Sequence, residues 1–152
     1  MSFEMYVTDH TPMTGVSDID AVAITFLHQV GYFPKGYDPK TSVDSVKQSV
    51  PYKLFMNCFM KNSDKAWTIE ELITILNTSR PTVYRHLNKL KSLDLLEEVE
   101  AENQRKRVKC YRIRYGSLSK AWNFVEAHVK VSMENYRKTV DHLQSLTDKS
   151  RR

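Results

Sequence analysis

The sequence predicts a mainly α-helical fold of the α+β class, and two observations lead to this prediction. Over most of the 152 residues, apolar side chains recur with the three-to-four-residue period of an amphipathic helix. One stretch, 95–114, instead combines short apolar–polar alternation with a polar middle, which is typical of a β-hairpin. No apolar run approaches the roughly 18 residues of a membrane span, so the pattern is that of a globular protein.

Residues 68–96 predict two short amphipathic helices joined by a tight turn. Thr68 and Glu71 form a capping box that starts the first helix. Asn77 tolerates the left-handed conformation that the turn needs, and Ser79 caps the second helix, with Pro81 in its first turn. The apolar stripes are Ile69, Leu72, Ile73 and Leu76 in the first helix, and Val83, Leu87 and Leu90 in the second.

The outer face of the second helix carries side chains suited to DNA. Guanidinium, hydroxyl and amide groups can bond base edges in the major groove, and lysine can contact phosphates. A solvated surface helix would also carry charges, so the helix alone does not decide between the two interpretations. The candidate DNA-binding residues here are Ser79, Arg80, Thr82, Tyr84, Arg85, Asn88 and Lys89.

The predicted hairpin has a basic returning strand. A polar tip is expected at 100–104, and residues 105–114 contain six basic side chains and no acidic one. A hairpin directly after a helix-turn-helix is a wing, and a basic wing suits the narrow, negative minor groove. We expect Arg105, Lys106 and Arg107 to contact DNA, and Arg112 or Arg114 to pair with Glu97, Glu98 or Glu100 on the opposing strand.

The positive charge begins where this module begins. Residues 1–64 contain 5 basic and 7 acidic side chains, whereas residues 65–116 contain 11 and 7 and residues 117–152 contain 7 and 4. The net charge of +5 is therefore concentrated in the second half of the chain. This distribution is the electrostatic footprint of a nucleic-acid-binding protein.

Residues 79–98 resemble the recognition helix and wing entry of the ArsR/MarR-type winged helix-turn-helix regulators. These typically read S-x-x-T-V-x-x-H-L-x-x-L-x-x-x-G-L-[IV], and Asp94 stands where the family usually has Gly. The resemblance covers roughly a third to a half of the chain. It implies a cytoplasmic, homodimeric transcriptional regulator that binds an inverted repeat in double-stranded DNA, with helix 79–93 in the major groove and wing 100–114 near the minor groove. The matching residues are Ser79, Thr82, Val83, His86, Leu87, Leu90 and Leu95.

Residues 117–148 predict one long helix, capped by Ser117, with residues 149–152 as a disordered tail. No Pro or Gly follows Gly116, and the helix would be ~43 Å long, which exceeds what a compact winged domain needs. We expect its apolar stripe to form a homodimer interface. Packing against a helix at 17–30 of the same chain is the alternative, and both can hold at once. The stripe is Leu118, Trp122, Val125, Val129, Met133, Tyr136, Val140 and Leu143, with one extra step of four residues.

The winged domain is expected at 51–116, behind a helical extension at 17–50. Ser17 is the predicted cap of the first helix, Gly31 its stop, and Thr41 the cap of a second, shorter helix. The aromatic residues of loop 32–39 are expected to fold back onto the helices. Residues 1–16 show no periodicity and no signal-peptide pattern, so they predict a flexible arm or a strand added to a partner.

The sequence contains no pattern typical of an enzyme or a cofactor-binding protein. It lacks a phosphate-binding glycine loop and any catalytic triad or paired-carboxylate pattern, and Glu126 and His128 lie off a shared helical face, so no metal site is predicted. Cys58 is expected to be a buried hydrophobe. Cys110 lies among cations, which would lower its pKa and allow a redox switch; filling the wing base is the alternative. A small-molecule effector is not specified. A winged protein-interaction module that does not read bases is the alternative to a DNA-binding regulator.

Overall fold

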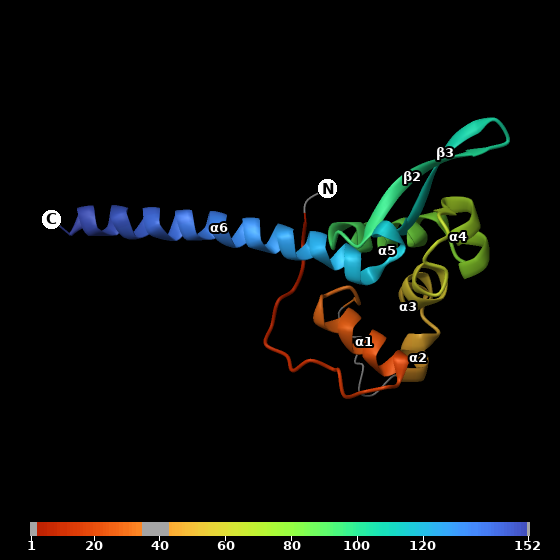
Figure 1. Ribbon diagram of the computed structural model, residues 1–152, viewed down its shortest axis with the longest axis horizontal. Coiled ribbons are helices and arrows are strands. Elements are labelled where there is room, and N and C mark those ends of the chain that lie inside the picture. Colours follow the sequence, from red (N-terminus) through yellow and green to blue (C-terminus); the bar gives the residue numbers. More distant parts are fainter. Residues whose placement is uncertain (1–2, 35–42, 152) are drawn as a thin grey trace.

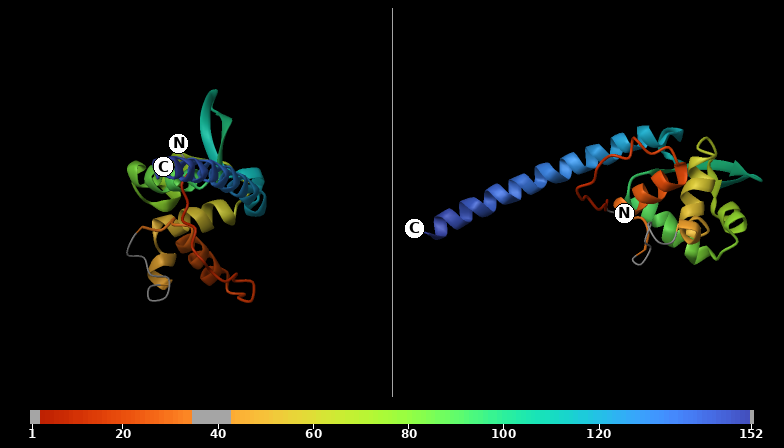
Figure 2. Two further views of the ribbon diagram at one scale, coloured as in Figure 1. Left: turned by 90° about the vertical axis from the view of Figure 1, so that its left-hand side faces the viewer. Right: turned by 90° about the horizontal axis from the view of Figure 1, so that it is seen from below.

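The computed structural model describes residues 3–34 and 43–151, in which a packed group of helices carries two projections (Figure 1). One projection is a β-hairpin and the other is the C-terminal helix (Figures 1 and 2). The mainly helical α+β class expected from the sequence is confirmed. In chain order the elements are α1 (Ile19–Gln29), α2 (Val43–Lys47), α3 (Val50–Tyr52), η1 (Lys53–Met60), β1 (Trp67–Thr68), α4 (Ile69–Leu76), α5 (Arg80–Ser92), β2 (Leu96–Asn103), β3 (Lys106–Ile113), η2 (Arg114–Gly116) and α6 (Leu118–Ser150).

The α4–turn–α5 unit forms as its local sequence predicts. Thr68 and Glu71 make the reciprocal capping box of α4, and Asn77 ends the helix in the left-handed conformation, with φ of 49°. The Ser79 side chain caps α5, with Pro81 in its first turn. Asp94, which stands in place of a glycine, also adopts a left-handed conformation, with φ of 61°. Each of these positions is decided by hydrogen bonds or torsions within a few residues.

The hairpin is longer than its sequence pattern suggests. Within the described residues the sheet order is β1–β3–β2, with both pairs antiparallel. Gln104 and Arg105 form the connecting turn with φ of 50° and 67°. Two consecutive left-handed residues match a type I′ turn, whose twist fits that of the flanking strands. The expected tip at 100–104 is therefore wrong, because β2 continues through Asn103.

The core lies between α4, α5, η1 and the base of the hairpin. Both predicted helical stripes face it, although Ile73 is only partly buried. Burying one large aliphatic side chain contributes about 1.5–3 kcal/mol, so this cluster dominates the stability of the domain. The largest fully buried side chains are Ile24, Leu27, Tyr32, Leu54, Phe55, Phe59, Leu72, Val83, Leu87, Leu90, Leu95 and Ile113.

The N-terminal helices extend this core, with several departures from the prediction. Asp18, and not Ser17, caps α1, because its carboxylate accepts the backbone N–H of Asp20 at 3.1 Å. Residues 53–60 have π-helical hydrogen bonding, which the amphipathic pattern does not distinguish from an α-helix. Val43, at the start of α2, is exposed. The expected cap at Thr41 lies outside the described residues.

The described part of the loop after α1 folds back as expected, whereas Tyr37 lies outside the described residues. Gly31 follows the helix with φ of +84°, and the ring of Tyr6 lies where a Cβ at this position would be. Tyr32 and Phe33 are buried, and the Tyr32 hydroxyl donates to the carbonyl oxygen of Pro51 at 2.7 Å. The loop thereby ties α1 to the start of the winged domain.

Residues 3–6, which begin the described part of the segment expected to be a flexible arm (1–16), lie against the domain. The backbone N–H of Glu4 donates to the carbonyl oxygen of Ser92 at 3.0 Å, and that of Tyr6 donates to Val30 at 3.3 Å. The ring of Phe3 stacks on His128 with 4.5 Å between centroids. These contacts connect the arm to the end of α5, the end of α1 and α6.

The C-terminal helix α6 is a single continuous element that leaves the domain after its first turns (Figure 2). Ser117 caps it, as predicted, and the helix reaches Ser150, two residues beyond the expected end at 148. Val125 is buried in the core of its own chain, and Trp122 packs against Phe26 of α1 at 5.7 Å between centroids. The beginning of the stripe is therefore used within the chain.

Candidate nucleic-acid interface

The outer face of α5 presents a short series of polar side chains. Arg80, Arg85, Asn88 and Lys89 are exposed, whereas Tyr84 is half-buried and packs against the core. The hydroxyl of Ser79 caps α5. Ser79 Oγ accepts a hydrogen bond from the backbone N–H of Thr82 at 3.3 Å and lies 2.9 Å from Thr82 Oγ1. The side chains at the start of α5 are thus partly fixed by the helix terminus, and those from Arg85 onward point freely outward.

Arg80 is held by a neighbouring helix. Its guanidinium pairs with the carboxylate of Glu70 in the first turn of α4, and both side chains are mostly exposed. The Glu70 carboxylate, with a smaller contribution from Tyr84, raises the pKa of Arg80 above its ordinary value. A base edge would therefore compete with Glu70 for this side chain.

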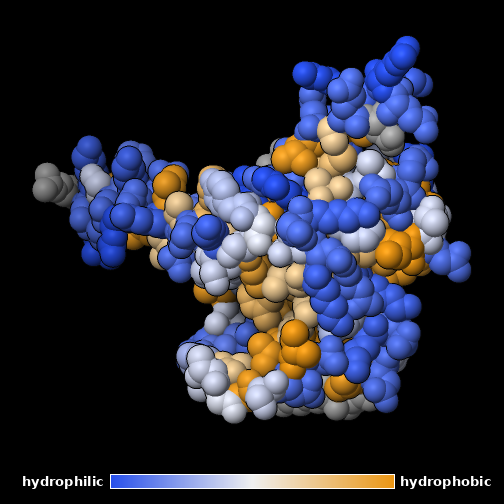
Figure 3. Space-filling view, turned by 45° about the vertical axis from the view of Figure 1, so that its right-hand side comes forward, coloured by the Kyte–Doolittle hydropathy of each residue, from blue (hydrophilic) through white to orange (hydrophobic). Residues whose placement is uncertain are grey.

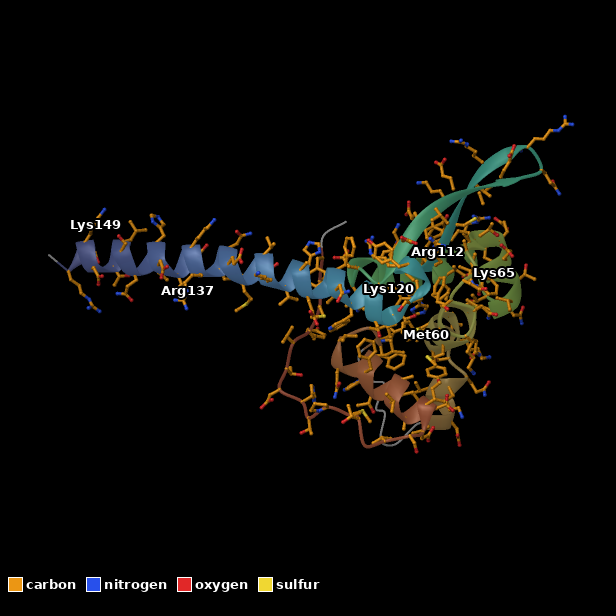
Figure 4. The ribbon with its side chains drawn as sticks, viewed as in Figure 1. Met60, Lys65, Arg112, Lys120, Arg137 and Lys149 are labelled. Atoms are coloured by element: carbon orange, nitrogen blue, oxygen red, sulfur yellow. The ribbon has the colours of Figure 1, made fainter. Side chains whose placement is uncertain are left out.

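The basic strand of the wing faces an acidic strand. Arg107 lies 3.2 Å from Glu100, Lys109 lies 4.0 Å from Glu98, and Arg112 lies 2.6 Å from Glu97. The last of these pairs confirms the cross-strand partner predicted for Arg112, and Figure 4 places Arg112 at the base of the wing. Oppositely charged pairs across two strands stabilise a hairpin by about 0.2–1 kcal/mol each.

Four cations are left for an external partner. Arg85 and Lys89 on α5, and Arg105 and Lys106 at the wing, form no ion pair with the described side chains. The outer end of the wing is covered by hydrophilic side chains (Figure 3). Three wing residues were expected to contact DNA, namely Arg105, Lys106 and Arg107. Among the described side chains, only Arg107 of the three forms an ion pair, and its side chain is 82% exposed.

His86 lies next to the candidate site, and its burial could not be predicted from the sequence. It matches the family pattern, but in the structure it is buried beneath the exposed face of α5, with 6% of its surface accessible. Burial, followed by the nearby charges of Arg85 and Lys89, lowers the pKa of His86 to about 4. Helix α5 therefore holds a neutral imidazole against the core.

This burial predicts a pH-dependent stability. The pKa of an unfolded histidine is about 6.5, so as the pH falls the unfolded chain takes up the proton first, and stability is lost between pH 6.5 and 4. Between pH 7 and pH 5, urea unfolding should show a loss of about 2 kcal/mol from this group. In a His86→Leu variant this portion of the loss should be missing. An identical pH dependence in both proteins would mean that His86 is not protonated on unfolding in this range.

The wing cysteine is not an activated thiol. Cys110 is buried, and desolvation, aided by the Glu71 carboxylate, raises its pKa. The predicted lowering of this pKa by neighbouring cations is wrong, because desolvation and the Glu71 charge both disfavour the thiolate. Cys58 is a buried hydrophobe as expected, and burial raises its pKa to about 11.

The residues near the start of α6 form a polar junction. His128 Nδ1 pairs with the carboxylate of Asp94, whose backbone oxygen accepts a hydrogen bond from Arg114 Nε at 2.9 Å. In the described part of the chain, no three His, Cys, Asp or Glu side chains are grouped to hold a metal ion. Asp94 thus links the turn after α5 to the wing base and to α6.

A helix-turn-helix followed by a two-stranded hairpin, with a third short strand on the inner edge, defines a winged helix-turn-helix domain. Residues 53–99 match a family model described as "Helix-turn-helix domain". Among solved structures, a "possible transcriptional regulator" from Methanosarcina mazei Go1 is similar at 18% identity, with 65% of this chain and 85% of that chain covered and a TM-score of 0.41. No curated protein matches the chain. In the described ranges, no helix is long and apolar enough to cross a membrane.

Proposed function

We propose that this protein is a homodimeric transcriptional regulator that binds double-stranded DNA in a sequence-specific manner. It acts at a promoter, either by occluding the promoter or by recruitment to it. The observation that carries the proposal is the set of unpaired cations on α5 and at the wing tip, Arg85, Lys89, Arg105 and Lys106, within a winged helix-turn-helix domain. In such domains the second helix enters the major groove and the wing reaches the flanking backbone or minor groove. The partner site would be an inverted repeat with half-site centres about one helical turn apart.

The proposal of a homodimer is supported by the part of α6 that lies beyond the domain. Met133, Tyr136, Val140 and Leu143 are between 54% and 66% exposed although they form one apolar stripe. Orange hydrophobic patches interrupt the hydrophilic surface of α6 in Figure 3. A continuous exposed stripe of this kind is typical of a protein–protein interface.

Fluorescence anisotropy with a labelled random duplex at low salt tests the DNA-binding function. We expect binding that weakens steeply as salt is added, because Lys and Arg contacts release counterions from the phosphates. Selection of bound genomic fragments would then supply the inverted repeat. A protein that binds no duplex at low salt would instead be a winged protein-interaction module.

The wing is expected to contribute about two phosphate contacts. Changing Arg105 and Lys106 together to Gln should lower affinity for all sequences and reduce the slope of log K against log salt by about 1.8, at roughly 0.9 for each lost contact. The control is Arg112→Gln, which removes a side chain that pairs with Glu97. This control should lower folding stability and leave the slope unchanged. An unchanged slope in the double variant would place the wing away from DNA.

Glu70 is expected to restrain Arg80. A Glu70→Gln change removes the charge that holds the guanidinium but keeps the side-chain shape, so Arg80 becomes available to a phosphate. Affinity for random duplex should rise, and the salt slope should become steeper by about 0.9. Glu134→Gln on the exposed part of α6 is the matched control, with the same charge change away from the interface. Equal effects of the two changes would indicate that only net charge matters.

A further inference from the structure

The apolar stripe of α6 has two parts with different surroundings. Val125 is 1% exposed in the core of its own chain, whereas Met133 is 61% exposed. This change in exposure occurs where the stripe has two successive spacings of four residues, from Val125 to Val129 and from Val129 to Met133. From there to the end, steps of three and four alternate as in a coiled coil, through Tyr136, Val140, Leu143 and Thr147.

We propose that the segment 129–147 pairs in parallel with the same segment of a second copy, so that both winged domains lie at one end of the dimer. This inference rests on the proposed homodimeric function and adds the polarity of the pair and its core residues. In heptad terms, Met133, Val140 and Thr147 occupy the a positions, and Val129, Tyr136 and Leu143 occupy the d positions. Val140 at an a position and Leu143 at a d position are residues that such positions hold in parallel two-stranded coiled coils.

A segment of this kind needs a partner. It is about 27 Å long at 1.5 Å per residue, and it contacts little of its own domain (Figure 1). Most of the stability of a helix in a protein comes from packing its amphipathic face, so this segment is expected to be stabilised by burying its apolar stripe. A second copy supplies a stripe of the same length and spacing.

The charges beside the stripe favour the parallel polarity. One flank carries Lys130, Arg137 and Gln144, and the other carries Ser132, Thr139 and Leu146, with no acidic residue at any of these six positions. In a parallel pair each flank faces the opposite flank of the partner, which places Arg137 against Ser132. In an antiparallel pair the basic flank faces itself and brings Arg137 or Lys130 close to a cation of the other copy.

The ion pair that Arg137 forms within its own helix does not remove this repulsion between the cations of the two copies. Asp141 lies 3.8 Å from Arg137 on the same helix, with both side chains mostly exposed. Exposed pairs four residues apart on a helix contribute only about 0.3–0.5 kcal/mol. Figure 4 shows Arg137 projecting from the part of α6 beyond the domain, where a second helix would lie beside it.

Disulfide trapping tests the polarity. In a parallel pair a cysteine at an a position faces its own copy across the two-fold axis, within the roughly 5.5–6 Å between Cα atoms that a disulfide needs. Thr147→Cys, oxidised in the folded protein by oxidised glutathione, should therefore give a covalent dimer on a non-reducing gel. Ser145→Cys is the matched control on the outer side of the helix, and it should stay largely uncrosslinked. The native Cys58 and Cys110 are both buried.

An antiparallel pair gives the opposite result. Its registers place Thr147 against Val129 or Tyr136 of the other copy, so Thr147→Cys alone would stay monomeric on the gel while a mixture with Val129→Cys or Tyr136→Cys would crosslink. That result, or no crosslink in any of these proteins, overturns the proposal. Anisotropy of the wild-type chain with duplex DNA is measured separately. If DNA is bound without the predicted crosslink, only the polarity fails, whereas absence of DNA binding refutes the proposed function.

Discussion

Replacing Arg85 with alanine should weaken binding to the cognate site by about 1–3 kcal/mol and relax selectivity at one base pair. Arg85 is exposed on α5 and has no acidic partner in the described structure, so its guanidinium is available for a bidentate contact with a guanine. The measurement is anisotropy against the selected site and against the same site with single base-pair changes. Arg80→Ala should have a smaller effect, because Glu70 already holds that side chain.

The control for Arg85 is Arg151→Ala, which removes the same charge at the end of α6. It should leave both affinity and selectivity unchanged. Wild-type affinity in the Arg85 variant, together with unaltered selectivity, would show that α5 is not the helix that reads the bases.

Changing Tyr136 and Leu143 together to glutamate should dissociate the proposed dimer at micromolar concentration. Both side chains are exposed in the isolated chain, so neither change disturbs the core of the domain, but burying unpaired like charges in a helix pair costs several kcal/mol. Light scattering should give the mass of one chain, and affinity for the inverted repeat should fall because only one half-site is held. Val129 is less suitable for this test, since it packs partly against its own domain.

The matched control carries two new glutamates on the outer side of the same helix, at Asn135 and Ser145. These positions lie away from the stripe, so this variant should remain dimeric and bind DNA with only a small electrostatic loss. A dimer that survives the Tyr136 and Leu143 changes would assign the self-association to another surface, and a wild-type monomer would end the proposal.

The helix-turn-helix could be predicted from sequence because its determinants are local. The capping box at Thr68, the left-handed Asn77 and the cap at Ser79 each depend on atoms within one turn. The length of the hairpin was harder to predict, because the turn at Gln104 and Arg105 contains no glycine that would mark its position in the sequence. The π-helical bonding of η1 is likewise absent from the residue pattern, which is the same for both kinds of helix.

The site could be predicted only in part, because neighbours in sequence are not always neighbours in space. Six basic residues lie along the returning strand of the wing, but acidic residues of the opposite strand pair with three of them, and Arg105 and Lys106 form no ion pair with the described side chains. The expected activation of Cys110 fails for another reason, because burial and the Glu71 carboxylate raise its pKa. Along α6, a single apolar stripe gave no sign of where the domain of the same chain stops covering it, which the exposure of Met133 reveals.

The contact between Phe3 and His128 joins two segments that are far apart in the sequence, and this has a consequence for synthesis on the ribosome. Phe3 is synthesised long before His128, the residue on which its ring stacks. Closing so long a loop carries a large entropic cost until the helices between are already packed. The arm must therefore wait without its partner during translation, and its docking marks a chain whose winged domain has already folded.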